Sequence, residues 1–231
     1  MTKHIIPLLI AAMLLVMGTG CARLDVVGNM SVESFSAILA SVPADVSSNE
    51  AIAGWTLAAP DGTASFSWSG DYSQSPMFDI MVSFDATPFL AAGLDPQKLP
   101  ESHIYSDGLL TVGKKLGSEQ LIYQGERTPL AGYARIVDKY RPVIGYHMGM
   151  DHYNIDLGGG NMFEWAKDMS INTVNKSAQD KDMVFVLDPA PFIAAGVDPE
   201  NVNGWAYAKV SVHTGGKPTE VYKVLKAFDL A

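Results

Sequence analysis

The segment HMGMDH at positions 147–152 concentrates the side chains of this chain that could do chemistry. Thioether sulfur and imidazole nitrogen are donors that suit Cu(I). Because side chains alternate along a strand, a strand here would place Met148, Met150 and His152 on one face and His147 on the other. This spacing predicts a copper site formed by Met148, Met150 and His152.

A core position is the competing interpretation of the same three side chains. When the chain is compared with itself at an offset of 97 residues, they align with Ala51, Ala53 and Trp55. Those residues are apolar, and methionine commonly fills irregular gaps in a core. The methionines can therefore be packing residues instead of ligands, and the sequence leaves both possibilities open.

Sequence motifs of catalysis and of phosphate binding are missing. Gly158–Gly160 could suggest a phosphate loop, but no Lys-Ser or Lys-Thr pair follows, so a hairpin turn is favoured. The sequence contains neither a Gly-x-Ser-x-Gly elbow nor a His-Glu-x-x-His motif. We therefore expect no catalytic residue, no cofactor and no enzymatic activity.

The first twenty residues have the parts of a secretory signal peptide. Lys3 precedes an apolar run of 13 residues from Ile5 to Met17, and Gly-Thr-Gly follows at 18–20. A membrane-spanning helix needs roughly 20 apolar residues, so a cleaved signal is favoured over a retained span. We expect a signal peptide over residues 1–20 and a tether over 21–30.

Cys21 is the only cysteine and follows this segment directly, so no disulfide can form within the chain. With Thr19 and Gly20 before it, Cys21 resembles the lipobox of prokaryotic lipoproteins, in which the cysteine is diacylated and becomes the new N-terminus. The resemblance covers residues 1–21 only. It implies a lipid anchor on Cys21 and a place in the cell envelope, facing outside the cytoplasm. Two acyl chains hold a protein stably on a membrane.

Charge and composition narrow the partners of the protein. The 231 residues include 25 acidic and 16 basic side chains, which gives a formal net charge of −9. A phosphate backbone would be repelled, so we expect no nucleic-acid partner. With 48% apolar and 18% charged residues, the chain can build a sizeable core.

An internal repeat organises the rest of the sequence. Residues 85–96 (DATPFLAAGLDP) recur at 188–199 (DPAPFIAAGVDP) with eight of twelve positions identical. The offset is 103 here and 97 upstream, which places a six-residue insertion within 169–182. At the offset of 103, Thr111, Gly113 and Lys114 would align with Thr214, Gly216 and Lys217. We predict repeats over 31–127 and 128–231.

Each repeat is predicted to open with a helix, capped by Ser31 in the first and by Thr128 in the second. Asp85 and Asp188 should cap short helices that end at Gly93 and Gly196. We expect strands at 54–58, 63–69, 78–84, 103–112, 143–148, 153–157, 162–166, 182–187 and 205–213, and a closing helix at 221–228. The predicted class is α+β, with two tandem repeats, each a helix plus an antiparallel sheet with a short helix before its last strand.

These features together predict a membrane-anchored, non-catalytic binding or structural module of the cell envelope, with a protein or small-ligand partner. A copper-binding lipoprotein is the alternative, and an envelope enzyme is the third possibility. Repeated positions mostly serve the shared fold. We therefore expect function where the copies differ, in the polar loop within 169–182 and in residues 146–153.

Overall fold

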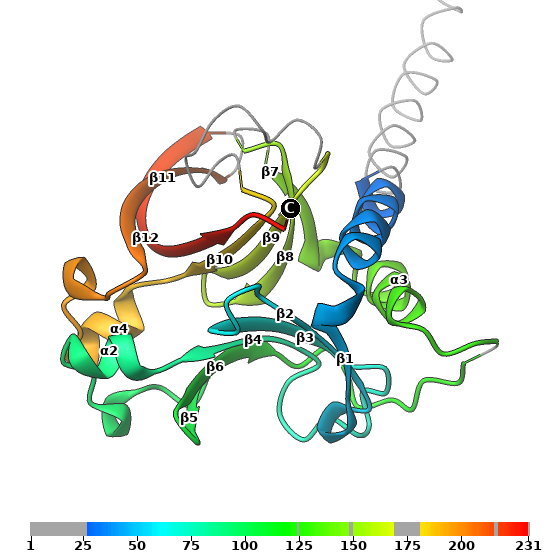
Figure 1. Cartoon of the computed structure of the whole chain (residues 1–231), viewed down its shortest axis with the longest axis horizontal. Helices are drawn as coiled ribbons and strands as arrows, with labels where there is room; N and C mark the ends of the chain where they lie inside the picture. Colours follow the sequence, from blue (N-terminus) through cyan, green and yellow to red (C-terminus); the bar gives the residue numbers. More distant parts are fainter. Residues whose placement is uncertain (1–26, 124, 148–149, 169–180, 215–216, 231) are drawn as a thin grey trace, which may run out of the picture.

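The computed structural model describes residues 27–123, 125–147, 150–168, 181–214 and 217–230 (Figure 1). Within these residues the chain forms two six-stranded antiparallel sheets and few helices. The fold is therefore richer in sheet than the predicted α+β class. Cys21, Met148 and most of the 169–182 loop lie outside the described residues. No helix of the described part is long and apolar enough to cross a membrane.

The two sheets have the same strand order, and each belongs to one half of the chain. The first sheet runs β1-β2-β3-β4-β6-β5, and the second runs β7-β8-β9-β10-β12-β11. The first consists of β1 (Val46–Asn49), β2 (Gly54–Ala58), β3 (Ala64–Trp68), β4 (Ile80–Asp85), β5 (His103–Ser106) and β6 (Leu109–Lys114). The second consists of β7 (Ile144–His147), β8 (His152–Gly158), β9 (Asn161–Ala166), β10 (Met183–Leu187), β11 (Ala206–Thr214) and β12 (Lys217–Phe228).

Helices occupy the predicted places in both halves. The described part begins with a helix over residues 27–41, which includes residues 27–30 of the expected tether. The second half opens with α3 (Pro129–Lys139), where the Thr128 hydroxyl accepts from the backbone N–H of Ala131 as predicted. Ser31 is not the cap of the first helix, because it lies inside that helix and donates to the carbonyl of Gly28. The short helices α2 (Thr87–Ala91) and α4 (Ala190–Ala194) precede the last hairpin of each sheet.

The two sheets pack face to face (Figure 1), and reciprocal contacts between repeat counterparts relate them by an approximate twofold axis. Three aromatic pairs, each with one ring from either half, lie on this boundary: Phe35–Tyr133 at 4.2 Å, Phe66–Phe163 at 4.5 Å and Phe89–Phe192 at 5.0 Å between ring centroids. All six side chains are fully buried. Phe66 and Phe163 are counterparts in the repeat and stack with an interplanar angle of 7°. One hydrophobic core therefore serves both halves.

Reciprocal backbone contacts mark the same axis beside α2 and α4. The N–H of Asp95 donates to the carbonyl of Ala195 at 2.8 Å, and the N–H of Asp198 donates to the carbonyl of Ala92 at 2.9 Å. Between these bonds lie Gly93 and Gly196, with φ of 104° and 101°. A Cβ on either glycine would lie 2.7 or 2.8 Å from the carbonyl oxygen of the other. The repeated Ala-Ala-Gly sequence thus permits the close approach of the halves.

Three elements of the structure differ from the prediction. The edge strand β1 was not predicted, because its sequence Val-Ser-Ser-Asn has no apolar alternation. Residues 103–112 form a hairpin, not one strand, since the chain turns at Asp107 and Gly108, which both have positive φ. Residues 221–228 belong to β12 and not to a closing helix. There, pairing with both β10 and β11 overrides the helical spacing of the apolar residues.

The last hairpin is much longer in the second half than in the first. Leu110 of β6 pairs with Phe84, whereas Val224 of β12 pairs with Leu187, so Val224 is the counterpart of Leu110. The alignment of 111–114 with 214–217 is therefore wrong, because extra residues lengthen β11 and β12. The long hairpin curves over the outer face of the second sheet (Figure 1). A second small apolar cluster fills the curve: Val184, Val186 and Leu225, with Met150, Met162, Ala208, Val210 and Ala227 against them.

The glycine contact yields a stability prediction. Gly93→Ala and Gly196→Ala should each lower the free energy of unfolding by roughly 3 kcal/mol. Two costs add: alanine disfavours the positive φ, and its Cβ would clash with the carbonyl oxygen of the other glycine. Gly204→Ala is the control, because Gly204 has φ of 77° with open space around its Cβ position. It should cost only about 1 kcal/mol. Urea unfolding measures the difference, and equal losses in all three variants would contradict the close contact.

Candidate functional site

The counterparts of residues 147–152 are fixed by strand pairing. Trp55 pairs with Trp68, and Tyr153 pairs with Trp165, at ring distances of 6.2 and 6.1 Å. Tyr153 is thus the counterpart of Trp55, one residue away from the offset of 97. The offset is 98 before the β8–β9 turn and 97 after it, because this turn is one residue shorter than the β2–β3 turn of the first half. The alignment of Met148, Met150 and His152 with Ala51, Ala53 and Trp55 is therefore wrong by one position.

The corrected register gives each chemically active residue of the second half a small counterpart in the first. His147 and His152 correspond to Asn49 and Gly54, because each pair of residues closes the first hairpin of its sheet. Glu164 corresponds to Ser67, since Phe163 and Trp165 correspond to Phe66 and Trp68. These substitutions all fall on the outer face of the second sheet, opposite the shared core.

A turn, and not a strand, connects the two histidines. β7 ends at His147, β8 begins at His152, and the N–H of Met150 donates to the carbonyl of His147 across the turn. Asp151 has a left-handed φ of 53°. Because His147 and His152 are direct cross-strand partners, they share one face, which corrects the prediction that they would point in opposite directions.

Glu164 lies between the two imidazoles and is the group that the sequence analysis missed. Its side chain on β9 is 1% exposed, that of His152 is 1% exposed, and that of His147 is 19% exposed. His147 Nδ1 is 3.6 Å from Glu164 Oε1, and His152 Nδ1 is 3.7 Å from Glu164 Oε2. The only sequence signal for this cluster was an acidic residue between two core aromatics, where the first half has a serine.

The opposite ring nitrogens hold both histidines in place. Nε2 of His152 is 2.8 Å from the carbonyl oxygen of Lys181, and Nε2 of His147 is 3.3 Å from that of Ser211. A carbonyl oxygen only accepts, so each Nε2 carries a hydrogen and donates it. The His147 bond also joins β7 to β11, which are the two edge strands of the second sheet.

The carboxylate and the imidazoles determine each other's charge. Burial by itself would raise the pKa of the Glu164 carboxyl, but His147 and His152 together outweigh burial and lower that pKa. The Glu164 carboxylate in turn raises the pKa of His147 against the opposing effect of burial. Oε2 of Glu164 and Nδ1 of His152 are buried without a hydrogen-bond partner. The cluster therefore holds polar atoms whose partner is not among the described protein atoms.

The predicted copper ligands are only partly placed by the structure. Met148 lies outside the described residues. Met150 packs against the apolar cluster inside the curved hairpin, and His152 lies beneath it beside Glu164. Among the described residues, no group of three or more His, Cys, Asp or Glu side chains could hold a metal ion. Copper binding by Met148, Met150 and His152 stays a prediction.

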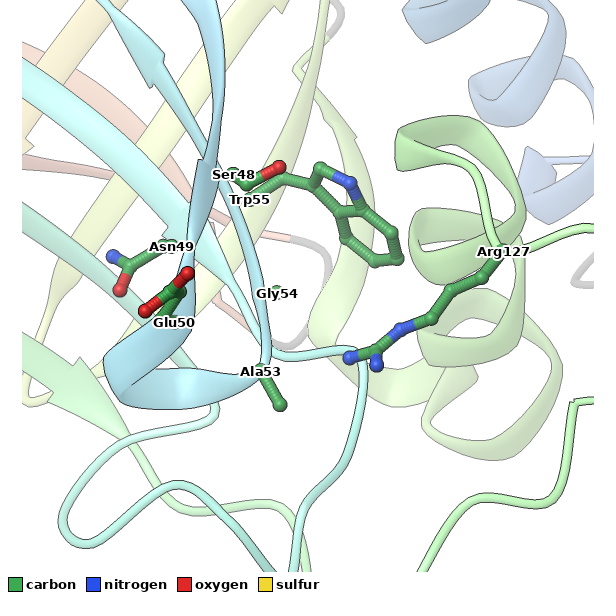
Figure 2. Close-up of a pocket in the computed structure, with 7 residues that line it drawn as sticks. All are labelled: Ser48, Asn49, Glu50, Ala53, Gly54, Trp55 and Arg127. Carbon is green, nitrogen blue, oxygen red and sulfur yellow. The ribbon is translucent and has the colours of Figure 1, made fainter.

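An open pocket of about 230 Å³ lies in the first half, between β1, β2 and the start of α3. Figure 2 shows the Arg127 side chain reaching toward Ala53 and Gly54 beside the Trp55 ring. The Arg127 guanidinium lies 5.6 Å from the centroid of Trp55 and 5.3 Å from that of Tyr123. These contacts connect Arg127, which lies just before α3, to rings at positions 55 and 123, and no buried charged group lines the pocket.

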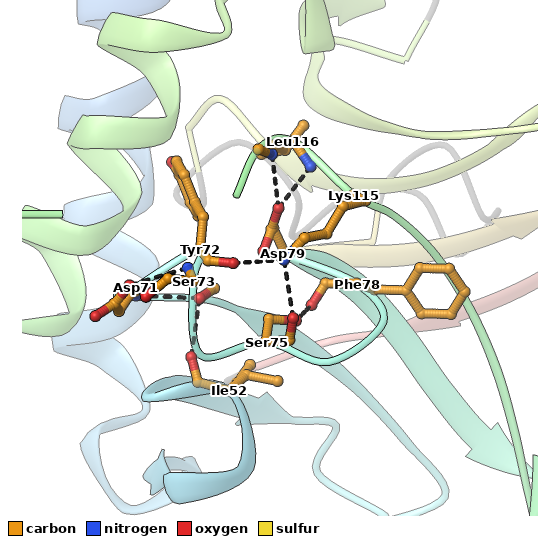
Figure 3. A network of polar contacts seen from close by, with 11 residues as sticks. Ile52, Asp71, Tyr72, Ser73, Ser75, Phe78, Asp79, Lys115 and Leu116 are labelled. Atoms are coloured by element: carbon orange, nitrogen blue, oxygen red, sulfur yellow. Dashed lines mark hydrogen bonds and ion pairs between the residues drawn. The ribbon is translucent and has the colours of Figure 1, made fainter. Parts of the chain in front are cut away.

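Asp79 is a buried carboxylate with several hydrogen-bond donors, and its role is structural. Its oxygens accept from Lys115 Nζ at 2.9 Å and from the backbone N–H groups of Leu116 and Gly117 at 2.6 and 3.0 Å (Figure 3). Lys115 Nζ also donates to the carbonyl of Ser75 at 2.8 Å. All these donors come from one segment, so Asp79 anchors the chain that leaves β6.

The pairing of His147 with Glu164 predicts a pH dependence of stability. A histidine with a raised pKa stabilises the fold fully below its unfolded pKa of about 6.5, and this contribution is lost as pH rises through the folded pKa. The lowered pKa of Glu164 adds stability that is lost when pH falls through its folded value, below about 4.3. His147→Asn should therefore cost most stability between these limits and less at higher pH.

Urea unfolding across this pH range, in buffer with a chelator, measures the effect. His103→Asn provides the contrast, because burial lowers the pKa of His103 and gives its contribution the opposite sign. A cost of His147→Asn that does not change with pH would contradict the charge pairing.

Comparison with known proteins identifies no relative of this chain. No protein-family model matches the chain, and neither a curated protein nor a solved structure has significant similarity to it.

Proposed function

We propose that this protein is a lipid-anchored, non-catalytic binding protein of the cell envelope. We further propose that it consists of two tandem copies of one unit: a helix, an antiparallel sheet, and a short helix before the last strands. In this proposal Cys21 holds the chain on a membrane outside the cytoplasm. The second copy carries the binding surface and the first copy supports it.

The difference between the two outer sheet faces is the observation that carries this proposal. In the first half that face is a ladder of hydroxyls bonded to one another: Thr56 to Ser67 at 2.8 Å, Ser83 to Thr111 at 2.8 Å, and Asn49 to Thr56 at 3.1 Å. In the second half the counterparts of Ser65, Ser67 and Ser83 are Met162, Glu164 and Val186. The inner faces, by contrast, keep matching aromatic residues.

A physical reason links this difference to function. Each inner face packs on the other half, so a change there disturbs the shared core. The outer faces make no such contact, and they have diverged in both polarity and charge. The apolar and titratable side chains of the second outer face lie outside the core shared by the two halves and are partly enclosed by the β11–β12 hairpin, and this divergence supports a binding role for the second half.

Membrane anchoring is tested at Cys21. Cys21→Ser should release the protein from the membrane fraction or leave the signal peptide uncut, because no acyl chain can then be attached. Fractionation followed by intact-mass measurement separates these results. A variant that is cut normally and still fractionates with membranes would overturn the lipid anchor.

The assignment of binding to the second half is tested by a reciprocal exchange. Met162→Ser gives the second half the residue of its counterpart, and Ser65→Met makes the opposite change in the first half. Met162 is partly buried, so Met162→Ser should cost no more than about 2 kcal/mol of stability.

Both variants are cross-linked in intact membranes, and the cross-linked species are compared with those of the unaltered protein. We expect Met162→Ser to lose most of the specific product and Ser65→Met to retain it. Equal retention in both variants, or loss in both, would contradict a binding surface confined to the second half.

A further inference from the structure

We propose that the open pocket beside Arg127 binds a small aromatic carboxylate, with the ring against Trp55 and the carboxylate on the guanidinium. Two sources supply this chemistry: a free aromatic acid, and an aromatic residue at the C-terminus of a peptide. This site goes beyond the proposed function, which places binding on the outer face of the second sheet and gives the first half a supporting part.

The second half shows which kind of group fits this place. In the β1–β2 hairpin Ser48 pairs with Trp55. In the β7–β8 hairpin Tyr146 pairs with Tyr153, the counterpart of Trp55, so Tyr146 is the counterpart of Ser48. The ring of Tyr146 packs against that of Tyr153 with 5.3 Å between centroids. The first half has no ring at this position, and an open pocket of about 230 Å³ lies there instead.

A pair of backbone hydrogen bonds supports this correspondence. The N–H of Gly70 donates to the carbonyl of Ala53 at 3.1 Å, and the N–H of Lys167 donates to the carbonyl of Asp151 at 3.1 Å. Ala53 and Asp151 both have a left-handed φ, of 45° and 53°. Gly70 is therefore the counterpart of Lys167, and Ala53 is the counterpart of Asp151.

The groups that hold the Tyr146 ring in the second half are replaced in the first. In the second half the Lys167 ammonium lies 5.7 Å from the ring centroid, and the Tyr146 hydroxyl donates to Asp151 Oδ1. Because Ala53 replaces Asp151, the first half has no acid at that point to accept from a ring substituent. A ring with a hydroxyl donor is thus not what the first pocket selects.

Arg127 supplies the cation of the first pocket. A Cβ on Gly70 would lie 2.7 Å from Arg127 Nη2, so the guanidinium lies where a side chain at position 70 would begin. The guanidinium carbon is 5.6 Å from the centroid of Trp55. No carboxylate of the described residues pairs with Arg127, and Glu50, the acid in the pocket wall, points away from it (Figure 2). The pocket therefore presents an aromatic wall and an unneutralised positive charge.

These two features select a planar acid as the ligand. The N–H donors of a guanidinium form a fixed fork that matches a carboxylate, and the two charges strengthen the hydrogen bonds. A ring packed on Trp55 gains the contact that Tyr146 makes with Tyr153. Pockets for drug-sized ligands begin at about 300 Å³, so this smaller pocket fits one ring with a short acid. The net charge of −9 on the chain favours one negative charge over a multiply charged phosphate.

The second half also supplies the variant that tests the site. Ser48→Tyr gives the first half the ring that Tyr146 provides in the second, so this variant fills its own pocket. Ser47→Tyr is the matched control, because side chains alternate along β1 and Ser47 therefore points to the opposite face. Arg127→Gln removes the charge of an exposed side chain and tests the site even if Ser48→Tyr fails to fold.

The experiment is an NMR titration of the full-length protein with phenylacetate. Acetate lacks the ring and benzyl alcohol lacks the carboxylate, so we expect both to bind about tenfold more weakly or worse. Arg127→Gln should weaken phenylacetate binding about 10–100-fold, as loss of hydrogen bonds between charged groups does. Ser48→Tyr should bind none and keep its melting temperature, and Ser47→Tyr should bind as the unaltered protein does.

Glycyl-phenylalanine, with a free and with an amidated C-terminus, separates the two sources of the ligand. Binding of the free form at least as tight as that of phenylacetate, with loss on amidation, supports a peptide C-terminus as the ligand. Binding of phenylacetate without binding of either dipeptide supports a free aromatic acid.

Several results would overturn the proposal. These are the absence of phenylacetate binding to the unaltered protein, unchanged binding by Arg127→Gln or by folded Ser48→Tyr, and equal affinity for acetate or for benzyl alcohol. Met162 lies on the second sheet and does not line this pocket. Failure of phenylacetate binding therefore leaves the cross-linking of Met162→Ser unchanged, and this proposal and the proposed function are tested separately.

Discussion

The contact between the two halves across their approximate twofold axis is the constraint on which the rest of the structure depends. Phe66 stacks on Phe163, and beside α2 and α4 the backbones approach closely enough that only glycine fits at positions 93 and 196. The two halves therefore stabilise each other as one core, and the residues on this boundary have little freedom to change.

This constraint leaves the outer faces as the place where the halves can differ. In the first half the outer face is polar and bonded to itself through pairs such as Thr56 and Ser67. In the second half a longer hairpin curves over the same face and encloses Val184, Val186 and Leu225. The enclosure removes water from Glu164 and His152, and this gives a carboxylate and an imidazole properties that they would not have on an open sheet.

His147 also connects the buried Glu164 carboxylate to the contact between the edge strands β7 and β11. His147 contacts Glu164 through Nδ1 and the carbonyl of Ser211 on β11 through Nε2. One side chain therefore joins the buried carboxylate to both edges of the second sheet. A change in charge at Glu164 acts directly on the contact between β7 and β11. By comparison, the Asp79 network is saturated by donors from a single segment and has no such connection.

By itself the sequence determined the internal repeat, the helix starting at Thr128, the two short helices with their glycine ends, and most of the strands. These features depend on local residue patterns, such as a cap, a proline in the first turn and alternation along a strand. Only the tertiary structure decided that 221–228 pairs as strand β12, that His147 and His152 share one face, and that Glu164 lies between them. Strand β12 depends on its pairing with β10 and β11, and the placement of the two histidines depends on the register of the β7–β8 hairpin. Such pairing is not a local property of the sequence, and a shift of one residue in a strand register reverses the face of every side chain.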